Sequence, residues 1–245
     1  MTRILVPYHI DEHLPTLDVP LRADTRIEAE LPGGDAWQRM AVLHERVAAA
    51  VAGAERPVVV SGDCTTSLGT VCGLQRAGLD PAIVWFDAHG DVQTLETTTS
   101  GYLGGLPLRM LVGYRPELLA STIGLAPVAE DRVLLVDARD LDPPERTYLA
   151  QSAIRRCEVA GVLGALPDRP LYLHVDLDVV DSGELPGLRF PAGGGPAPSA
   201  VAGAVRQVLA TGRVAAVGVG CTWYPQRGAA ARIGPHLVAA LGEWA

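Results

Sequence analysis

Short, unbroken apolar runs alternate with amphipathic stretches along most of the chain. Such runs are typical of strands buried on both faces of a sheet, and apolar positions at helical spacing are typical of helices packed against one. The pattern predicts strands at 4–7, 57–61, 82–86, 133–136, 171–176 and 214–219. It predicts helices at 35–54, 65–78, 106–112, 144–155, 199–210 and 229–241, with a loop at 183–198. Strands and helices that alternate in this way indicate an α/β fold with a parallel sheet covered on both faces.

The most informative stretch begins with the strand at 82–86 and reads AIVWFDAHGDVQTLETTTSGYLGG. Asp87, His89 and Asp91 follow the apolar run directly. In an extended segment, residues two apart point the same way, so these side chains are expected to converge on one point. Uncompensated carboxylates so close to a core are costly, and a divalent cation would offset that cost. The stretch therefore predicts a metal site.

A second cluster, His174, Asp176 and Asp178, repeats this spacing at the end of the strand at 171–176. In parallel sheets ligands bind at the carboxyl ends of the strands, where both clusters fall. Together they offer enough side chains for a two-metal centre with bridging carboxylates. The alternative is that Asp87 and Asp176 only cap helices and His89 is an ordinary buried histidine. Two such motifs, each after an apolar strand, favour the metal.

Composition narrows the class of protein. A chain of 245 residues with 48% hydrophobic content is expected to form one domain over 1–245. Its net charge of −8 argues against nucleic acid or an anionic membrane surface as a partner. The start, MTRILVPYHI, is too quickly polar for a signal peptide, and no apolar run approaches a membrane span. The four cysteines show no CxxC spacing, so we expect a cytoplasmic protein with reduced thiols.

Over 57–225 the motifs resemble those of the ureohydrolase (arginase/agmatinase) superfamily. The family's strand-end motifs read GGDHS, DAHxD and SxDxDxxDP, where this chain has SGDC, DAHGD and HVDLDVVD. Two further segments, TTTSGYLGG and RDLDPPE, resemble the TTTSGNLHG and RDVDPGE of arginases. The resemblance implies a three-layer αβα sandwich around a mainly parallel sheet. It also implies a C–N hydrolase of the amidinohydrolase type with two divalent metal ions, Mn²⁺ being expected.

The family's metal ligands carry over residue by residue. Asp87 and Asp176 match the bridging aspartates, and His89 and Asp178 match ligands of one ion. Asp91 matches a ligand of the other ion and the group that accepts the proton of a metal-bridging hydroxide.

Several positions depart from the family. Cys64 stands where the family has a histidine ligand, and a thiolate there would shift the preference toward zinc or iron; the alternative is a buried thiol that binds no metal. Gly104 aligns with the catalytic histidine of arginases, and Phe190 with a threonine. The carboxylate that pairs with the substrate guanidinium should fall near Cys221 or Thr222, and neither is acidic.

The amino-acid end of an arginase pocket is better retained. Asp142 and Glu145 match residues that hold the α-ammonium group, and Ser100 matches a contact of the carboxylate. Gln93 and Tyr102 replace asparagines as hydrogen-bond donors. The alternative for Asp142 and Glu145 is that they only begin a helix, where acidic residues are favoured.

His174 replaces a serine of the family and is a second catalytic candidate beside Asp91: it could bind metal, act as an acid, or hydrogen-bond to a metal ligand. The missing histidine and carboxylate fit a less basic C=N substrate than arginine. The changes at Cys64 and Gly104 resemble those of the arginase-like Nω-hydroxy-L-arginine hydrolase of cycloserine biosynthesis. We therefore expect hydrolysis of an arginine-like amino acid, such as Nω-hydroxy-L-arginine, to ornithine and a urea.

Two other functions stay open at this point. One is a catalytically inactive relative that keeps metal or ligand binding for a regulatory role, and the other is a single-zinc deacetylase. A small molecule is the expected partner, and the sequence leaves a homo-oligomer open.

Overall fold

The computed structural model describes residues 1–242 and Trp244. Its main strands are β1 (Thr2–Val6), β4 (Thr25–Arg26), β5 (Pro57–Ser61), β6 (Ala82–Asp87), β7 (Val133–Asp137), β8 (Arg155–Cys157), β9 (Leu171–Asp176) and β10 (Val214–Gly220). They form one eight-stranded sheet in the order β4-β1-β5-β10-β9-β6-β7-β8, and every neighbouring pair is parallel. The unbroken apolar runs that predicted β5, β6 and β9 are buried along their whole length.

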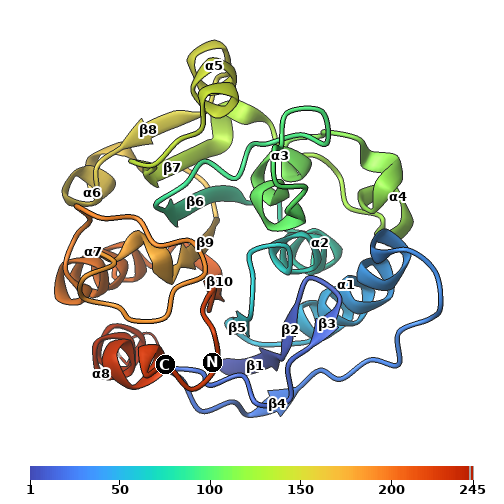
Figure 1. Cartoon of the computed structure of the whole chain (residues 1–245), viewed down its shortest axis with the longest axis horizontal. Coiled ribbons are helices and arrows are strands. Elements are labelled where there is room, and N and C mark those ends of the chain that lie inside the picture. The colour runs from blue at the N-terminus through green and yellow to red at the C-terminus, as the bar shows by residue number, and fades with distance from the viewer. Residues whose placement is uncertain (243, 245) are drawn as a thin grey trace.

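Helices cover both faces of this sheet. They are α1 (Ala36–Ala52), α2 (Ser67–Arg76), α3 (Pro107–Leu111), α4 (Ala120–Ile123), α5 (Pro143–Gln151), α6 (Val162–Ala165), α7 (Pro198–Leu209) and α8 (Ala229–Gly242). Figure 1 shows α7 and α8 on one side of the sheet and α1 to α4 on the other. The expected αβα sandwich is confirmed.

Each face has its own hydrophobic core, because alternate side chains of a strand point to opposite faces. On β6, Val84 and Phe86 belong to the core beneath α7 and α8, whereas Ile83 and Trp85 belong to the core beneath α1 and α2. The central strands are thus held from both sides, and their carboxyl ends are rigid positions for a site.

Helix starts agree with the sequence to different degrees. Asp35 caps α1, and its side chain accepts a hydrogen bond from the backbone amide of Gln38 over 2.9 Å. Thr66 is the residue before α2, but its side chain makes no capping bond because its backbone is already helical. Asp63 instead accepts the amide of Thr65 over 2.7 Å.

The structure corrects the helix expected at 144–155. α5 ends at Gln151, and residues Arg155–Cys157 form the edge strand β8 beside β7. This strand carries mostly exposed side chains, so its pairing depends on backbone hydrogen bonds that no apolar pattern announces.

The amino-terminal region also holds more structure than expected. The short strands β2 (Tyr8–His9) and β3 (Glu12–His13) form an antiparallel pair, and β4 is an edge strand of the main sheet. The loop expected at 183–198 is confirmed up to Pro198, where α7 begins. None of the described helices is both long and apolar enough to span a membrane. That the chain forms one domain over 1–245 stays a prediction.

Candidate metal centre

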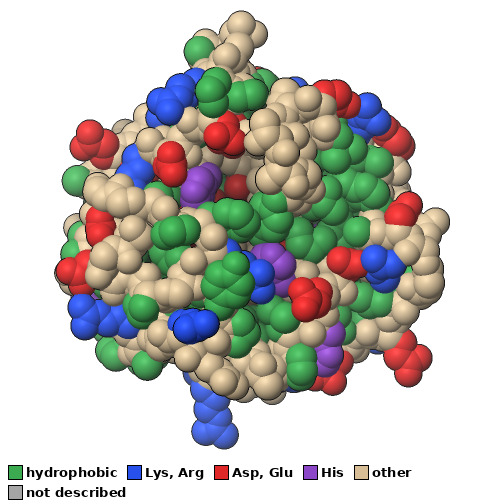
Figure 2. All heavy atoms as spheres, in the orientation of Figure 1, with side chains coloured by type: hydrophobic (Ala, Val, Ile, Leu, Met, Phe, Trp, Pro, Cys, Tyr) green, Lys and Arg blue, Asp and Glu red, His purple; other side chains and the backbone are tan. Residues whose placement is uncertain are grey.

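A cavity of about 130 Å³ opens where the carboxyl ends of the middle strands meet. Figure 2 shows a hollow near the centre of this face, with histidine and acidic side chains around it. The cavity is lined by most of the site residues that the sequence singled out: Cys64, His89, Asp91, Gln93, Ser100, Tyr102, Asp142, Glu145, Asp176 and Asp178. Asp87 lies just beneath it and is 1% exposed.

Two groups of side chains are close enough to hold metal ions, and they share Asp87. Cys64, Asp87 and Asp176 form one group, and Asp87, His89 and Asp178 form the other. Within each group the candidate ligand atoms lie within 4.8 Å of one another. Four residues of the two strand-end motifs therefore come together, whereas Asp91 and His174 belong to neither group.

The route by which they converge differs from the sequence-based expectation, which placed them on extended segments. β6 ends at Asp87, whose Oδ1 accepts the backbone amide of His89 over 2.7 Å. The same turn recurs at Asp176, whose Oδ1 accepts the amide of Asp178 over 2.9 Å. Aspartates often form such turns with the amide two residues on, so turns rather than strands aim the ligands.

Asp91 has the most constrained backbone of the group. Its φ is +54°, in the left-handed region that few residues other than glycine adopt, although aspartate tolerates it. Its Oδ2 is buried and has no hydrogen-bond partner in the described part of the chain. A buried oxygen of this kind is costly unless something binds it.

Burial and neighbouring carboxylates raise the pKa values of Asp91, Asp176 and Asp178. At Asp87, by contrast, burial is outweighed by the bonds and charge of His89, which lower its pKa. Burial, then the charges of Asp87 and Asp176, raises the pKa of Asp91 well above its ordinary value. Burial and the charge of Asp87 raise the pKa of Asp178 to about 6. The pocket thus confines more negative charge than its side chains can balance.

One positive group offsets part of this charge. His89 Nδ1 lies 3.0 Å from Asp178 Oδ2 and 3.3 Å from Asp87 Oδ1. Burial by itself would lower the pKa of His89, but these two carboxylates raise it to about 12. The oxygen, nitrogen and sulfur donors, the surplus negative charge and the unpartnered Asp91 oxygen together fit divalent cations.

Asp176 is fixed by two side-chain donors. Cys64 Sγ donates to its Oδ2 over 2.8 Å, and Thr222 Oγ1 donates to its Oδ1 over 2.6 Å. Burial and then the charges of Asp176, Asp91 and Asp87 raise the pKa of the Cys64 thiol well above its ordinary value. Metal binding by Cys64 would have to displace this proton.

His174 lies beneath the site rather than in the cavity lining. Its ring packs on Trp85, with ring centroids 3.8 Å apart, and its Nδ1 lies 3.1 Å from Ser67 Oγ. Burial lowers its pKa to about 3, so the ring is neutral. Trp85, which the sequence analysis did not select, donates its indole N–H to Asp87 Oδ2 over 3.1 Å. The Nε2 of His174 is buried and has no hydrogen-bond partner among the described residues, and the role of this side chain stays a prediction.

At the opposite wall, Asp142 and Glu145 both line the cavity and begin a helix. They form the capping box of α5. Glu145 also accepts the amide of Val92 over 3.3 Å, and Asp142 Oδ2 accepts Gln93 Nε2 over 2.8 Å. The helix-start role is therefore confirmed, whereas contact with a substrate stays a prediction that their place in the cavity lining allows.

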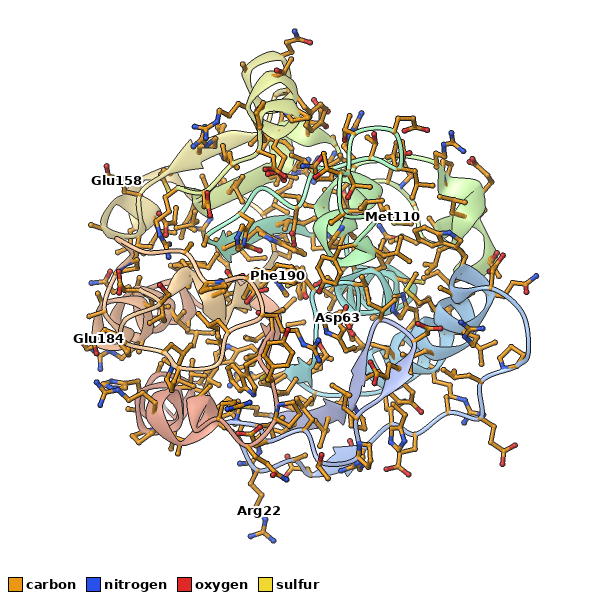
Figure 3. The ribbon with its side chains drawn as sticks, in the orientation of Figure 1. Arg22, Asp63, Met110, Glu158, Glu184 and Phe190 are labelled. Carbon is orange, nitrogen blue, oxygen red and sulfur yellow. The ribbon has the colours of Figure 1, made fainter. Side chains whose placement is uncertain are left out.

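An aromatic wall closes another side of the cavity. The Tyr102 ring stacks on His9 with centroids 5.6 Å apart, and it packs on Phe190 with centroids 4.5 Å apart. Phe190 lies near the centre of the view in Figure 3, over the middle strands. His9 was not expected in the site, because its distance in sequence hides the contact.

Comparisons with known proteins agree with this geometry. The profile of the Arginase family matches residues 6–239. The chain is 33% identical over 153 residues to the arginase of Bacillus subtilis (strain 168), which covers 57% of this chain and 52% of that protein. It is 31% identical over 169 residues to the N(omega)-hydroxy-L-arginine amidinohydrolase of Streptomyces lavendulae, which covers 67% of this chain and 59% of that protein. These alignments thus span between half and two thirds of each relative.

Solved structures share the fold. The arginase from Bacillus subtilis superposes with a TM-score of 0.82 at 22% identity, over 100% of this chain and 98% of that chain. The formimidoylglutamase from the same species superposes with a TM-score of 0.76 at 16% identity, over 99% of this chain and 86% of that chain. Since the family profile matches nearly the whole sequence, the chain belongs to the arginase family.

Proposed function

We propose that the protein is a metal-dependent amidinohydrolase that cleaves a C–N bond in the guanidine-type group of an arginine-like amino acid, with Nω-hydroxy-L-arginine as the foremost candidate. The observation that carries this proposal is the pair of ligand groups that share Asp87 and whose other members line the cavity. Arginase-family enzymes generally use a two-metal centre, typically of Mn²⁺, and this donor set fits one.

In this proposal Cys64 and Asp91 would hold one ion, His89 and Asp178 would hold the other, and Asp87 and Asp176 would contribute to both sites. When bound, the two ions would supply Lewis acidity and make water nucleophilic at neutral pH. The protein's own side chains would transfer the proton and bind the substrate. Asp91 has a buried Oδ2 free of hydrogen bonds to the described residues, so it is placed to take a proton from the attacking water. It would then pass that proton to the departing amine.

The opposite wall would hold the amino-acid end of the substrate. Asp142 and Glu145 would attract the α-ammonium group, and Ser100 and Gln93 would hydrogen-bond to the α-carboxylate. The capping box and the bond between Gln93 and Asp142 fix these groups in advance, which lowers the cost of ordering them on binding.

The residue expected beside the guanidine end of the substrate supports the choice of an N-hydroxyguanidine. Thr222 lines the cavity, and its hydroxyl is committed to Asp176, so this position offers no carboxylate to a guanidinium. A fully charged group would be poorly compensated there. The hydroxyguanidine group is less basic than the guanidine group of arginine, so its binding depends less on a compensating carboxylate at this position. The similarity to the N(omega)-hydroxy-L-arginine amidinohydrolase of Streptomyces lavendulae supports the same choice.

The test is a substrate panel with Mn²⁺-loaded protein: Nω-hydroxy-L-arginine, L-arginine, agmatine and 4-guanidinobutyrate, assayed for urea or hydroxyurea release. We expect the highest kcat/KM with Nω-hydroxy-L-arginine and loss of turnover in Asp87→Asn. A protein that binds Mn²⁺ and turns over none of the four would instead support the inactive, ligand-binding alternative.

A further inference from the structure

Gly104 and Tyr102 compete for one space in the cavity wall. Gly104 is buried in the 3-10 turn Leu103–Gly105 and lines the cavity. A Cβ atom added to Gly104 would lie 2.2 Å from Cζ of Tyr102 and 2.3 Å from its hydroxyl oxygen. Real Cβ atoms essentially never come within 3.0 Å of another heavy atom. The Tyr102 phenol therefore occupies the place that any side chain at 104 would need.

Two aromatic neighbours fix the ring in that place. Tyr102 stacks on His9 at an interplanar angle of 19° and packs on Phe190 at 37°. His9 is itself held, because its Nδ1 lies 2.9 Å from the carbonyl oxygen of Gly62. Since rotating the ring away would break both aromatic contacts, the hydroxyl is preorganised.

The hydroxyl is available to a ligand. Tyr102 contributes its backbone amide to the hydrogen bonds of the described residues, donating to Ser100 Oγ over 3.2 Å, and its hydroxyl takes part in none of them. Burial, then the charges of Asp63, Cys64, Asp91 and Asp176, raises its pKa well above the ordinary value. It is therefore a neutral O–H donor beside the proposed metal ligands.

A neutral donor discriminates among guanidine-type groups by their acceptors. A protonated guanidinium has N–H donors and no acceptor, so an O–H group facing it gains no hydrogen bond. The oxygen of a hydroxyguanidine has lone pairs and accepts one. A site built around such a bond strongly rejects the analogue that lacks it.

We propose that the Tyr102 hydroxyl is a specificity-determining catalytic donor to the oxygen of an N-hydroxyguanidine substrate, and that Gly104 is required because the Tyr102 ring fills its side-chain space. This inference rests on the proposed function and assigns a residue to its choice of substrate.

The first test removes only the hydroxyl. Tyr102→Phe keeps the ring and its stacking, so the melting temperature and the bound metal should not change. We expect kcat/KM for Nω-hydroxy-L-arginine to fall about 100-fold, the loss typical of one preorganised donor, and that for L-arginine to stay within about twofold. The matched control is Tyr224→Phe, at a tyrosine that is 51% exposed, with both substrates unaffected. Equal losses with both substrates, or no loss with either, would overturn the donor role.

The second test concerns the shared space and needs no substrate. Gly104→Ala should lower the melting temperature markedly in the wild-type background and much less in the Tyr102→Ala background. Equal shifts in both backgrounds would overturn the steric exchange. If the wild-type protein turns over no guanidine compound, the proposed function fails and the donor role falls with it. The melting-temperature cycle still decides whether Tyr102 and Gly104 share one space.

Discussion

Cys64 Sγ donates to Asp176 Oδ2 over 2.8 Å, from the carboxyl end of β5 across β10 to the end of β9. A thiol thus hydrogen-bonds to a proposed bridging carboxylate. The family motif GGDHS has a histidine at the position of this cysteine. Whether this sulfur binds metal decides which ions the centre prefers, because thiolates favour softer metals than imidazole does.

Cys64→His should therefore raise the ratio of bound manganese to bound zinc and iron, measured by elemental analysis of protein purified under identical metal supply. Cys157→Ser, at a half-buried thiol on β8, is the control and should leave metal content alone. Unchanged metal content and unchanged turnover in Cys64→His would show that the sulfur is not a ligand.

Stabilisation by Mn²⁺ should grow with pH. In the folded protein the pKa of Asp178 is raised from 3.8 to about 6, and those of Asp91 and Asp176 are raised well above their ordinary value. Because these folded-state pKa values exceed the unfolded ones, their contribution to stability is complete below the unfolded pKa and is lost as pH rises through each folded-state pKa, which for Asp178 is about 6. Metal requires the deprotonated forms, so it binds more tightly over the same range.

The measurement is the melting temperature with Mn²⁺ and with chelator at about pH 5 and about pH 8. A free metal concentration of roughly 100 times Kd stabilises by about 2.7 kcal/mol. If Mn²⁺ raised the melting temperature relative to chelator by the same amount at both pH values, the involvement of these carboxylates would be contradicted.

Asp91→Asn should preserve the fold, because asparagine also tolerates the left-handed backbone at φ +54°. Turnover should fall about 100-fold or more, the usual contribution of a general acid–base group, and metal affinity should fall with it. Asp131→Asn, at an exposed aspartate on a distant turn, is the matched control. Full activity in Asp91→Asn would rule out its role in proton transfer.

His174→Gln separates support of the ligands from acid catalysis. The ring is buried and neutral, with its pKa lowered to about 3, so at neutral pH it lacks the acidic second proton of an imidazolium. We expect kcat to stay within about tenfold, since the loss of a general acid typically costs 100-fold or more. A larger loss at unchanged metal content would make His174 a catalytic residue.

Asp142→Ser tests the α-ammonium contact without removing the cap, because serine caps helices nearly as well as aspartate. KM for amino-acid substrates should rise about tenfold, as expected for loss of one charged hydrogen bond, and KM for 4-guanidinobutyrate, which lacks the α-ammonium, should not change. Asp142→Ala should in addition cost about 1 kcal/mol of stability. Equal effects of Asp142→Ser on both substrates would assign Asp142 to the helix alone.

The sheet could be predicted because its central strands are buried on both faces and read as unbroken apolar runs. Charged residues directly after those runs then located the cavity at the correct edge. The edge strand β8 and the short strands near the amino terminus were missed, because backbone pairing stabilises them and leaves no apolar pattern.

Within the site, the sequence identified the residues of the two clusters but not the side chains that hydrogen-bond to them. Asp87 and Asp176 could be selected from their position alone, whereas Thr222 approaches Asp176 from the segment after β10, at a separation of 46 residues. The extended geometry was wrong because a one-dimensional pattern does not show that a carboxylate will bond the amide two residues on. The metal, catalytic and substrate-binding roles of these residues stay predictions.

The start of α5 ties two properties of the molecule together. The same carboxylates that face the cavity also begin the helix and anchor the segment that carries Gln93. A substitution of Asp142 or Glu145 that admitted a different molecule would therefore also destabilise the start of α5. Changes at the exposed Ser100 would disturb the scaffold less, because its hydroxyl bonds within its own loop, to the backbone amide of Tyr102 and the hydroxyl of Thr98.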